Sequence, residues 1–412
     1  MKASCFHWWK KPLYTSTHGS KPLAVDYRLD DQATAGPLAK LEDLRWLFAN
    51  LGLDPHYREW FRHRAWVRTI HGTTRIEGNS LNDLQVAEVL ERLPATRTKD
   101  ALEVIATRAA LAFVDEIATD PELQIDERVI REIHKRVIDE IDPMLRPGAF
   151  RTGENRVGDA EGNIIFATAL SGDVPDVMHR FGTWLRDGAG GEHPVVAAAL
   201  AHLELVAIHP FDDGNGRTAR ALSRLLLVKH GFALDGLVSL DAFLDLQRRE
   251  YFAAIRASLG TAYTRGYDAT LFVRYYLDAI RGAADHVLSR VKGTTELLRQ
   301  LRGAVATDEL SAQLIDPLVY AWINGSIRAS DYREITGRTG PSATRDLARA
   351  VRAGYLTVTG ETRARRYGAG PKLQAVQPVP VTQRGVNWTR YRPPSITRPC
   401  RSARRCCAIR NS

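Results

Sequence analysis

Apolar residues spaced three or four positions apart are the feature that most limits how this chain can fold. The spacing begins at Leu38 and continues to about Val291. It places apolar side chains along one face of an α-helix, and such a face needs other helices to pack against. Residues 151–168 break the spacing with Gly and Asn, and they predict a β-hairpin with a long turn. We therefore expect an all-α fold from which one hairpin protrudes.

The positive charge of the chain is concentrated at its C-terminal end. The 412 residues carry a formal net charge of +9, and residues 371–412 contain nine Lys and Arg but no Asp or Glu. Subtracting these nine from 57 basic residues leaves 48, which equals the number of acidic residues. Residues 1–370 are therefore neutral, and the basic composition does not by itself indicate that the folded part binds nucleic acid.

Cysteine placement and apolar run length indicate the compartment. The four cysteines are Cys5, Cys400, Cys406 and Cys407. None lies between residues 6 and 399, which excludes a disulfide scaffold or a cysteine–zinc site in the core. No run approaches the roughly 18 apolar residues of a membrane-spanning helix, and the first residues lack the apolar segment of a secretory signal. We expect a cytoplasmic protein with no membrane partner.

Changes in composition and periodicity divide the chain into six segments. These are an N-terminal arm (1–36), a helical segment (37–100), a helical core (101–290), a helical connector (291–326), a small module (327–370) and a disordered basic tail (371–412). In the small module, two short helical patterns separated by a Gly-containing turn precede a hairpin pattern. That order is typical of a winged helix-turn-helix.

Residues 209–220, with the sequence HPFDDGNGRTAR, form a loop that leads into a helix. Backbone N–H groups at Gly214, Asn215 and Gly216 can converge on a phosphate where that helix begins, and the helix dipole favours negative charge there. Glycine allows a ligand to approach the backbone closely. The segment therefore predicts a phosphate-binding site.

Four side chains in the same segment add chemistry to this site. Arg217 and Arg220 lie on one face of the helix and can hold further phosphate oxygens. Asp213 is an oxygen ligand suited to Mg²⁺ that also contacts substrate phosphates. His209 titrates near neutral pH and can act as a general base. Each residue alone has an ordinary structural explanation. The combination of a base, a metal ligand, a phosphate cradle and two arginines within twelve residues is much harder to explain by structure alone.

The segment resembles the motif of the Fic (filamentation induced by cAMP) family, His-x-Phe-x-(Asp/Glu)-Gly-Asn-Gly-Arg-x-x-Arg. The fixed positions are matched by His209, Phe211, Asp213, Gly214, Asn215, Gly216, Arg217 and Arg220. The resemblance extends over roughly residues 70–285 and implies an all-α Fic catalytic core over 101–290. It also implies transfer of AMP from ATP, as co-substrate, to a Ser, Thr or Tyr hydroxyl of a target protein.

The resemblance assigns a role to each motif residue. His209 would take the proton from the target hydroxyl, and Phe211 would anchor the loop in the core. Asp213 would hold Mg²⁺, with Mn²⁺ as the alternative, against the phosphates of ATP. The remaining five residues would bind ATP: Asn215 and the backbone at Gly214 and Gly216 near the α-phosphate, Arg217 and Arg220 at the outer phosphates.

Two further regions would complete the nucleotide and target sites. The hairpin resembles the family's flap, which would align the target backbone by adding a strand. Within it, Val157 and Gly158 would lie near the nucleotide. Tyr251 and Phe252 fall where the family places aromatic residues near the adenine, and core packing explains this pair equally well.

A second motif, residues 73–78 with the sequence TTRIEG, lies upstream of the core. Thr73, Glu77 and Gly78 match the (Ser/Thr)-x-x-x-Glu-(Gly/Asn) motif of Fic proteins that carry an N-terminal inhibitory segment. The resemblance implies that Glu77 pairs with Arg220 and prevents productive binding of ATP. The alternative is a Glu at a helix C-terminus with Gly as its cap.

Two other functions remain open at the level of the sequence. The same site can run in reverse as a de-AMPylating phosphodiesterase, with Glu77 orienting a water. The small module can make the chain a DNA-binding regulator, because Arg345, Arg349 and Arg352 lie on the expected recognition helix. A protein-docking or dimer module is the alternative for that region. The sequence leaves open which protein is the target and whether the chain forms a homodimer.

Overall fold

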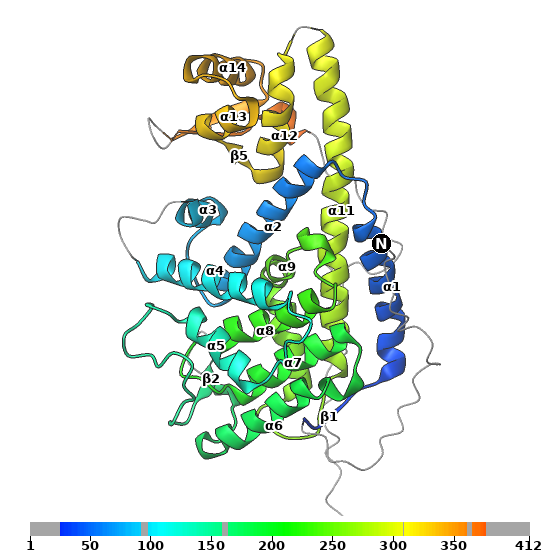
Figure 1. Ribbon diagram of the computed structural model, residues 1–412, viewed down its shortest axis with the longest axis vertical. Coiled ribbons are helices and arrows are strands. Elements are labelled where there is room, and N and C mark those ends of the chain that lie inside the picture. The colour runs from blue at the N-terminus through cyan, green and yellow to red at the C-terminus, as the bar shows by residue number, and fades with distance from the viewer. Residues whose placement is uncertain (1–24, 92–97, 159–163, 308, 361–364, 376–412) are drawn as a thin grey trace, which may run out of the picture.

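The computed structural model describes residues 25–91, 98–158, 164–307, 309–360 and 365–375. Most of these residues are helical, and the strands are short (Figure 1). The all-α prediction is therefore confirmed. Within the described residues, no helix combines the length and apolar character needed to cross a membrane.

The first helices lead from the N-terminal side into the body. Helix α1 spans Asp31–Ala49, α2 spans Pro55–Ile76, α3 spans Asp83–Glu91 and α4 spans Lys99–Ile117. Sequence periodicity suggested a helix from Leu38, but α1 begins seven residues earlier because the Asp30 side chain accepts a hydrogen bond from the Ala33 N–H. The helix also accommodates Pro37. The first 24 residues of the expected arm lie outside the described residues.

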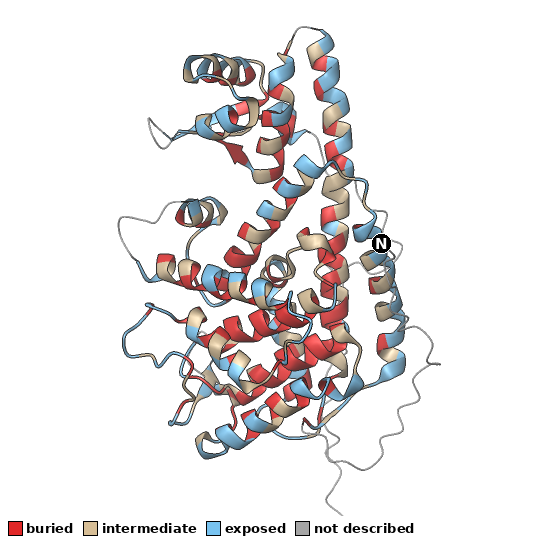
Figure 2. Ribbon diagram, viewed as in Figure 1, coloured by how far each residue is buried: buried red, intermediate tan, exposed pale blue. Residues whose placement is uncertain are grey.

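The centre of the fold is a pair of helices, α7 (Pro194–Ile208) and α8 (Asn215–Lys229), which pack against each other. Almost every residue of α7 is buried, as Figure 2 shows by the red ribbon in the middle of the body. A helix that is apolar on all sides must be enclosed by other elements. Helices α4 and α5 (Glu127–Val137) cover α8, and α6 (Val174–Arg186) and α10 (Arg248–Leu259) complete the body together with the short α9 (Leu240–Leu246).

The longest helix, α11, spans Thr270–Ala306 and runs along much of the molecule (Figure 1). It packs against α1, α7, α9 and α10 in the body and against α12 (Ile315–Asn324) farther along the chain. The expected boundary between core and connector, at residues 290 and 291, falls inside this continuous helix. The six-segment division of the chain remains a prediction.

Two small sheets accompany the helical body. Strands β2 (Arg156–Gly158) and β3 (Ile164–Ala167) form the expected antiparallel hairpin, with Val157 opposite Phe166. Its turn, residues 159–163, lies outside the described residues. Strand β1 (Tyr27–Arg28) pairs in parallel with β4 (Tyr267–Asp268), which ties the start of the described chain to the segment before α11.

The C-terminal part has two helices and a three-stranded antiparallel sheet. The helices are α13 (Ala329–Thr336) and α14 (Gly340–Arg352), and the strands β5 (Ser326–Ile327), β7 (Arg366–Ala369) and β6 (Leu356–Thr359) lie in that order. These helices and the hairpin lie where the sequence predicts them. Their function as a winged helix stays a prediction. The short helix α15 (Pro371–Gln374) begins the expected tail, and residues 376–412 lie outside the described residues.

Candidate active site

The loop between α7 and α8 begins at His209, which adopts a left-handed backbone conformation with φ 53°. This conformation ends α7, and it is uncommon for a residue other than Gly. The Nδ1 of His209 lies 3.2 Å from the carbonyl oxygen of Val206. Because a carbonyl only accepts, Nδ1 carries the proton and Nε2 keeps a lone pair. Burial lowers the pKa of His209, so the ring is neutral at neutral pH and Nε2 can accept a proton.

Phe211 and Asn215 hold the loop closed on itself. Phe211 is fully buried, as the resemblance requires of a loop anchor. Asn215 Oδ1 accepts the Phe211 N–H at 2.9 Å, and Asn215 Nδ2 donates to the Phe211 carbonyl at 2.9 Å. The Asn215 side chain is thus occupied by the backbone of the loop. Its expected contribution to the α-phosphate remains a prediction.

Two glycines make the start of α8 accessible to a ligand. Gly214 has φ +76°, and a Cβ there would lie 2.7 Å from Ile138 Cγ2, so no other residue fits without rearrangement. A Cβ on Gly216 would lie 2.2 Å from the Glu77 carboxylate oxygen Oε1. The Glu77 carboxylate therefore rests directly on the backbone where the phosphate cradle is expected.

Arg220 is held by two residues of the upstream motif, Thr73 and Glu77. Its Nε donates to Thr73 Oγ1 at 2.6 Å, and its Nη2 donates to the Thr73 carbonyl at 2.9 Å and to Glu77 Oε1 at 2.7 Å. Burial lowers the pKa of Arg220, but the charges of Glu77, Tyr251 and Asp241 and the hydrogen bond to Glu77 together outweigh burial, and the pKa is raised. Arg220 therefore stays charged, and all these donors point to the upstream motif.

Glu77 is at the same time the cap residue that ends α2, and Gly78 follows with φ +100°. The helix-cap alternative for this motif is therefore present, and it coexists with the contact to Arg220. Ending the helix at this point directs the carboxylate toward α8.

Arg217 is buried between two carboxylates. Its Nη2 lies 3.6 Å from Asp213 Oδ2, and its Nη1 lies 3.9 Å from Oε1 of Glu103 on α4. Nε and Nη1 of Arg217 have no hydrogen-bond partner among the described residues. Both atoms are buried, and leaving buried guanidinium donors without acceptors is costly.

Three residues of this site were missed by the sequence interpretation. Arg151 is buried, and it donates from Nε to the His209 carbonyl at 2.8 Å. Glu103 accepts from Asn79 Nδ2 at 2.8 Å, which connects the residue directly after the upstream motif to the neighbourhood of Arg217. His134, on α5, stacks against Phe211. Burial lowers the pKa of His134 to about 4. These residues are distant in sequence from the motif, and no local sequence pattern predicts that a single Arg, Glu or His will contact the loop.

The Mg²⁺ assignment fits the residues present. Among the described residues, no cluster of three or more His, Cys, Asp or Glu side chains is arranged for a metal. Asp213 supplies a single, half-exposed carboxylate at the edge of the cradle. Mg²⁺ is commonly bound through one or two carboxylates together with substrate phosphates and waters, so a single carboxylate is sufficient here.

The aromatic pair lies on α10, and the two flap residues lie on β2. Tyr251 is buried, with its hydroxyl 2.7 Å from His202 Nε2, whereas Phe252 is exposed on α10. Val157 and Gly158 lie on β2, and Asn155 just before them approaches the Phe211 carbonyl at 3.5 Å. The nucleotide contacts expected of these four residues remain predictions.

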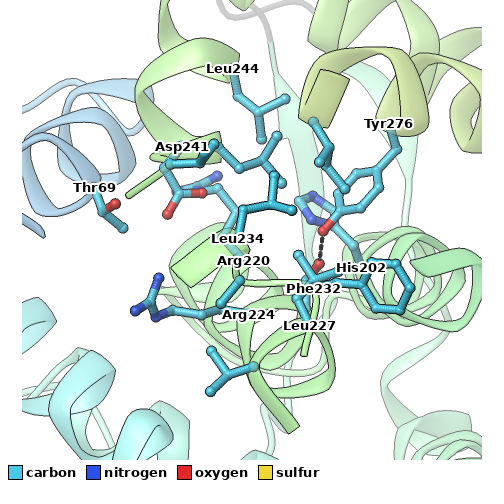
Figure 3. A pocket seen from close by; sticks show the side chains of 16 residues that line it. Thr69, His202, Arg220, Arg224, Leu227, Phe232, Leu234, Asp241, Leu244 and Tyr276 are labelled. Carbon is cyan, nitrogen blue, oxygen red and sulfur yellow. Dashed lines mark hydrogen bonds between the residues drawn. The ribbon is translucent and has the colours of Figure 1, made fainter. Parts of the chain in front are cut away.

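A cavity of about 40 Å³ lies next to Arg220, lined among others by Thr69, His202, Asp241 and Tyr276 (Figure 3). It has room for water molecules but is far smaller than the roughly 300–1,000 Å³ of ligand pockets. A nucleotide therefore cannot bind there, and the start of α8, where Gly216 is half-buried beneath the Glu77 carboxylate, is the candidate binding surface.

Comparisons with known proteins identify relatives of this chain. The sequence profile of the Fic/DOC family matches residues 124–227. The protein adenylyltransferase fic-1 of Caenorhabditis briggsae is 33% identical over 247 residues, which are 58% of this chain and 44% of that protein. The protein adenylyltransferase Fic of Aedes aegypti is 35% identical over 172 residues, which are 41% of this chain and 33% of that protein. The chain thus spans less than half the length of these relatives.

Solved structures agree in fold. A Fic family protein from Desulfovibrio desulfuricans aligns with a TM-score of 0.52 and 22% identity, covering 84% of this chain and 98% of that one. Fic-1 from Caenorhabditis elegans aligns with a TM-score of 0.50 and 29% identity, covering 63% of this chain and 72% of that one.

Proposed function

Since the chain carries a Fic/DOC family domain over residues 124–227, we propose that it is an autoinhibited protein adenylyltransferase. In this reaction a target hydroxyl oxygen attacks the α-phosphorus of ATP, the bond to the β-phosphate oxygen breaks, and pyrophosphate leaves. The observation that carries the proposal is the neutral His209, with a free Nε2, at the entrance of a helix N-terminus where the Gly216 backbone is covered by the Glu77 and Arg220 side chains.

The residues of the loop divide the work of this reaction. His209 Nε2 takes the proton of the attacking hydroxyl. The N–H groups at the start of α8 and the free donors of Arg217 bind phosphate oxygens. Mg²⁺, held by Asp213, would neutralise charge on the phosphates. Phe211, Asn215 and Arg151 keep the loop in place, so the reacting groups are oriented before the substrate arrives.

Autoinhibition follows from where Glu77 lies. Its carboxylate occupies the space above Gly216 and takes up donors of Arg220 that an outer phosphate would need. The Glu77 side chain is 36% exposed, whereas Arg220 is 2% exposed. The carboxylate can therefore move away from the mouth of the site while the arginine stays in place. Activation then requires that the carboxylate of Glu77, the residue that caps α2, leave the space above Gly216.

The reverse activity remains the alternative for the same site. A de-AMPylating phosphodiesterase would use the Glu77 carboxylate, beside the cradle, to orient a water toward an AMP-modified side chain. The contact between Glu77 and the cradle is compatible with both directions.

Two incubations distinguish the directions. In the first, wild type and Glu77→Gly receive α-labelled ATP, Mg²⁺ and a cell lysate, and mass spectrometry identifies proteins that gain an adenylyl group. In the second, both receive an AMP-modified protein, and release of AMP is measured. Transfer by Glu77→Gly supports the adenylyltransferase, and release of AMP by wild type alone supports the phosphodiesterase. If neither transfer nor release is observed, both proposals are contradicted.

A second candidate function, DNA binding, is favoured by the surface of α14. Ala343, Leu347 and Ala350 are buried, and the opposite side exposes Arg345, Arg349 and Arg352. Three arginines on one exposed face can contact successive phosphates of a nucleic-acid backbone. The protein-docking alternative for this module also remains.

Salt dependence and a charge-matched control test this candidate. Affinity for a DNA duplex should fall as salt rises, and Arg345→Ala with Arg349→Ala should weaken it and reduce the salt slope by about two. The control, Arg299→Ala with Arg302→Ala on α11, removes the same charge elsewhere and should change little. Equal loss in the two variants, or binding that disappears only when residues 371–412 are deleted, would assign the contact elsewhere.

A further inference from the structure

The ring of His134 supports the catalytic loop from α5, an element outside the motif. It stacks on Phe211 with ring centroids 3.6 Å apart and planes 3° from parallel, and the residue is 1% exposed. Its Nε2 lies 3.0 Å from the Asp213 carbonyl oxygen, and its Nδ1 lies 3.0 Å from the Gly148 backbone nitrogen. One side chain therefore contacts the loop anchor, the expected metal ligand and the segment that leads to the flap.

The partners of the two ring nitrogens determine the tautomer. The Gly148 N–H can only donate, so Nδ1 must accept and carries no proton. The Asp213 carbonyl can only accept, so Nε2 must donate. Only the neutral tautomer with its proton on Nε2 satisfies both contacts. The remaining Nδ1 donor of an imidazolium would face another donor.

On the side of α5, neighbouring side chains leave the loop little room to shift. A Cβ on Gly214 would meet Ile138 Cγ2 and Val137 Cγ1, and His134 Cδ2 lies 3.5 Å from the same point. On the opposite side the Asn215 amide binds the Phe211 backbone. The loop is thus held between α5 and α8, and His134 supplies a polar contact from α5.

We infer that His134 is a positioning residue for the proposed transfer: by donating from Nε2 to the Asp213 carbonyl, it fixes the backbone that presents the Asp213 carboxylate to the metal and the nucleotide. The inference rests on the proposed function for its kinetic consequence. It assigns a role in the reaction to a residue that touches neither substrate. Loss of such supporting contacts typically costs about 10–100-fold in metal affinity or activity.

Two substitutions separate the contacts of the ring. His134→Gln keeps a donor near the position of Nε2 and removes the acceptor for Gly148. His134→Asn keeps an acceptor near the position of Nδ1 and removes the donor for Asp213. Both lose the stacking on Phe211. Ile130→Val, a buried residue one helical turn earlier on α5, is the control for loss of stability alone, at about 0.5–1.5 kcal/mol.

The variants are compared in full-length protein that also carries Glu77→Gly, so that transfer is measurable. We expect His134→Asn to lower kcat about 10–100-fold with little change in the KM for ATP, and His134→Gln to retain most activity. Binding of Mn²⁺ with an ATP analogue that resists cleavage, followed by electron paramagnetic resonance, should weaken in the same order. Equal losses in both variants, or a loss that Ile130→Val reproduces at the same melting temperature, would overturn the inference.

A measurement without turnover keeps this inference separate from the proposed function. Nitrogen NMR of the wild-type protein near pH 7 should show a protonated Nε2 and an unprotonated Nδ1 for His134. If no variant transfers AMP, the proposed function is contradicted. If NMR shows the opposite tautomer, or if His134→Asn leaves the affinity for Mn²⁺ unchanged, only the inference about His134 is contradicted.

Discussion

The Glu77 carboxylate and the Arg220 guanidinium, 143 positions apart in the sequence, lie 2.7 Å from each other at the start of α8. Thr73 supplies two further acceptors, so three hydrogen bonds of Arg220 are directed at α2 and at Glu77, which caps it. The pair connects the end of α2 to the part of α8 where phosphate binding is expected. Whether Arg220 is available to a ligand is therefore decided by the position of α2.

Replacing Glu77 tests this relationship most directly. Glu77→Gly should raise adenylyl transfer roughly 30- to 1,000-fold, because a partly buried Arg–carboxylate pair contributes about 2–4 kcal/mol to the inhibited state. The measurement is auto-modification with labelled ATP and Mg²⁺. Glu77→Gly with Arg220→Ala should be inactive, and Glu122→Gly, an exposed turn residue, serves as control. Equal labelling of wild type and Glu77→Gly would show that Glu77 acts only as a helix cap.

Removing the general base should separate chemistry from binding. In the Glu77→Gly background, His209→Ala should lower the transfer rate about 10²–10⁴-fold, because no other group would accept the proton of the target hydroxyl. ATP affinity, measured by calorimetry, should change little because the imidazole contacts the nucleophile. A His209→Ala protein that transfers AMP at the parent rate would show that another group is the base.

The pH profile should reflect the lowered pKa of His209. Burial disfavours the imidazolium, so the ring stays neutral and active to lower pH than an ordinary His, whose pKa is about 6.5. The rate of Glu77→Gly should therefore stay level as the pH falls from 8 to 6.5 and decline only below that value. We would measure kcat/KM between pH 5 and 8.5. A half-maximal point at or above 6.5 would contradict the assignment.

A methyl group on Gly216 should block the site in both states. The added Cβ would stand 2.2 Å from Glu77 Oε1, so Gly216→Ala must displace the carboxylate, yet the same methyl occupies the cradle. We expect weaker ATP binding and no activation, with or without Glu77→Gly. Gly303→Ala on α11 is the matched control, since nothing lies within 4 Å of its Cβ. If Gly216→Ala alone activated transfer, the phosphates of ATP would have to bind at a place other than the Gly216 backbone.

The last prediction concerns the charge that accompanies Arg217. Glu103→Gln keeps an oxygen for the Asn79 amide but removes the negative charge 3.9 Å from the buried Arg217 guanidinium. The melting temperature should fall, because a buried cation loses part of its compensation. Mg²⁺-ATP should then raise the melting temperature more in Glu103→Gln than in wild type, because phosphate restores the charge. Identical shifts would mean that Arg217 does not contact the nucleotide.

The sequence by itself determined the local parts of this protein. Helical periodicity predicted the body, the Gly and Asn residues of 151–168 predicted the hairpin, and the order of residues in 209–220 placed a base, a metal ligand and donors at one helix start. These features depend on neighbours a few residues apart, for which the backbone geometry follows from residue type. The resemblance added the pairing of Glu77 with Arg220, which composition and spacing alone do not contain.

Only the tertiary structure decided which distant side chains complete the site. Arg151 binds the backbone of His209 from 58 positions away, and His134 reaches Asp213 from 79 positions away. It also decided that the Asn215 amide holds Phe211 and that Tyr251 is buried against His202. Such contacts depend on how α4, α5 and α10 pack around α7 and α8. Helix packing fixes side-chain distances that no periodicity within a single helix records.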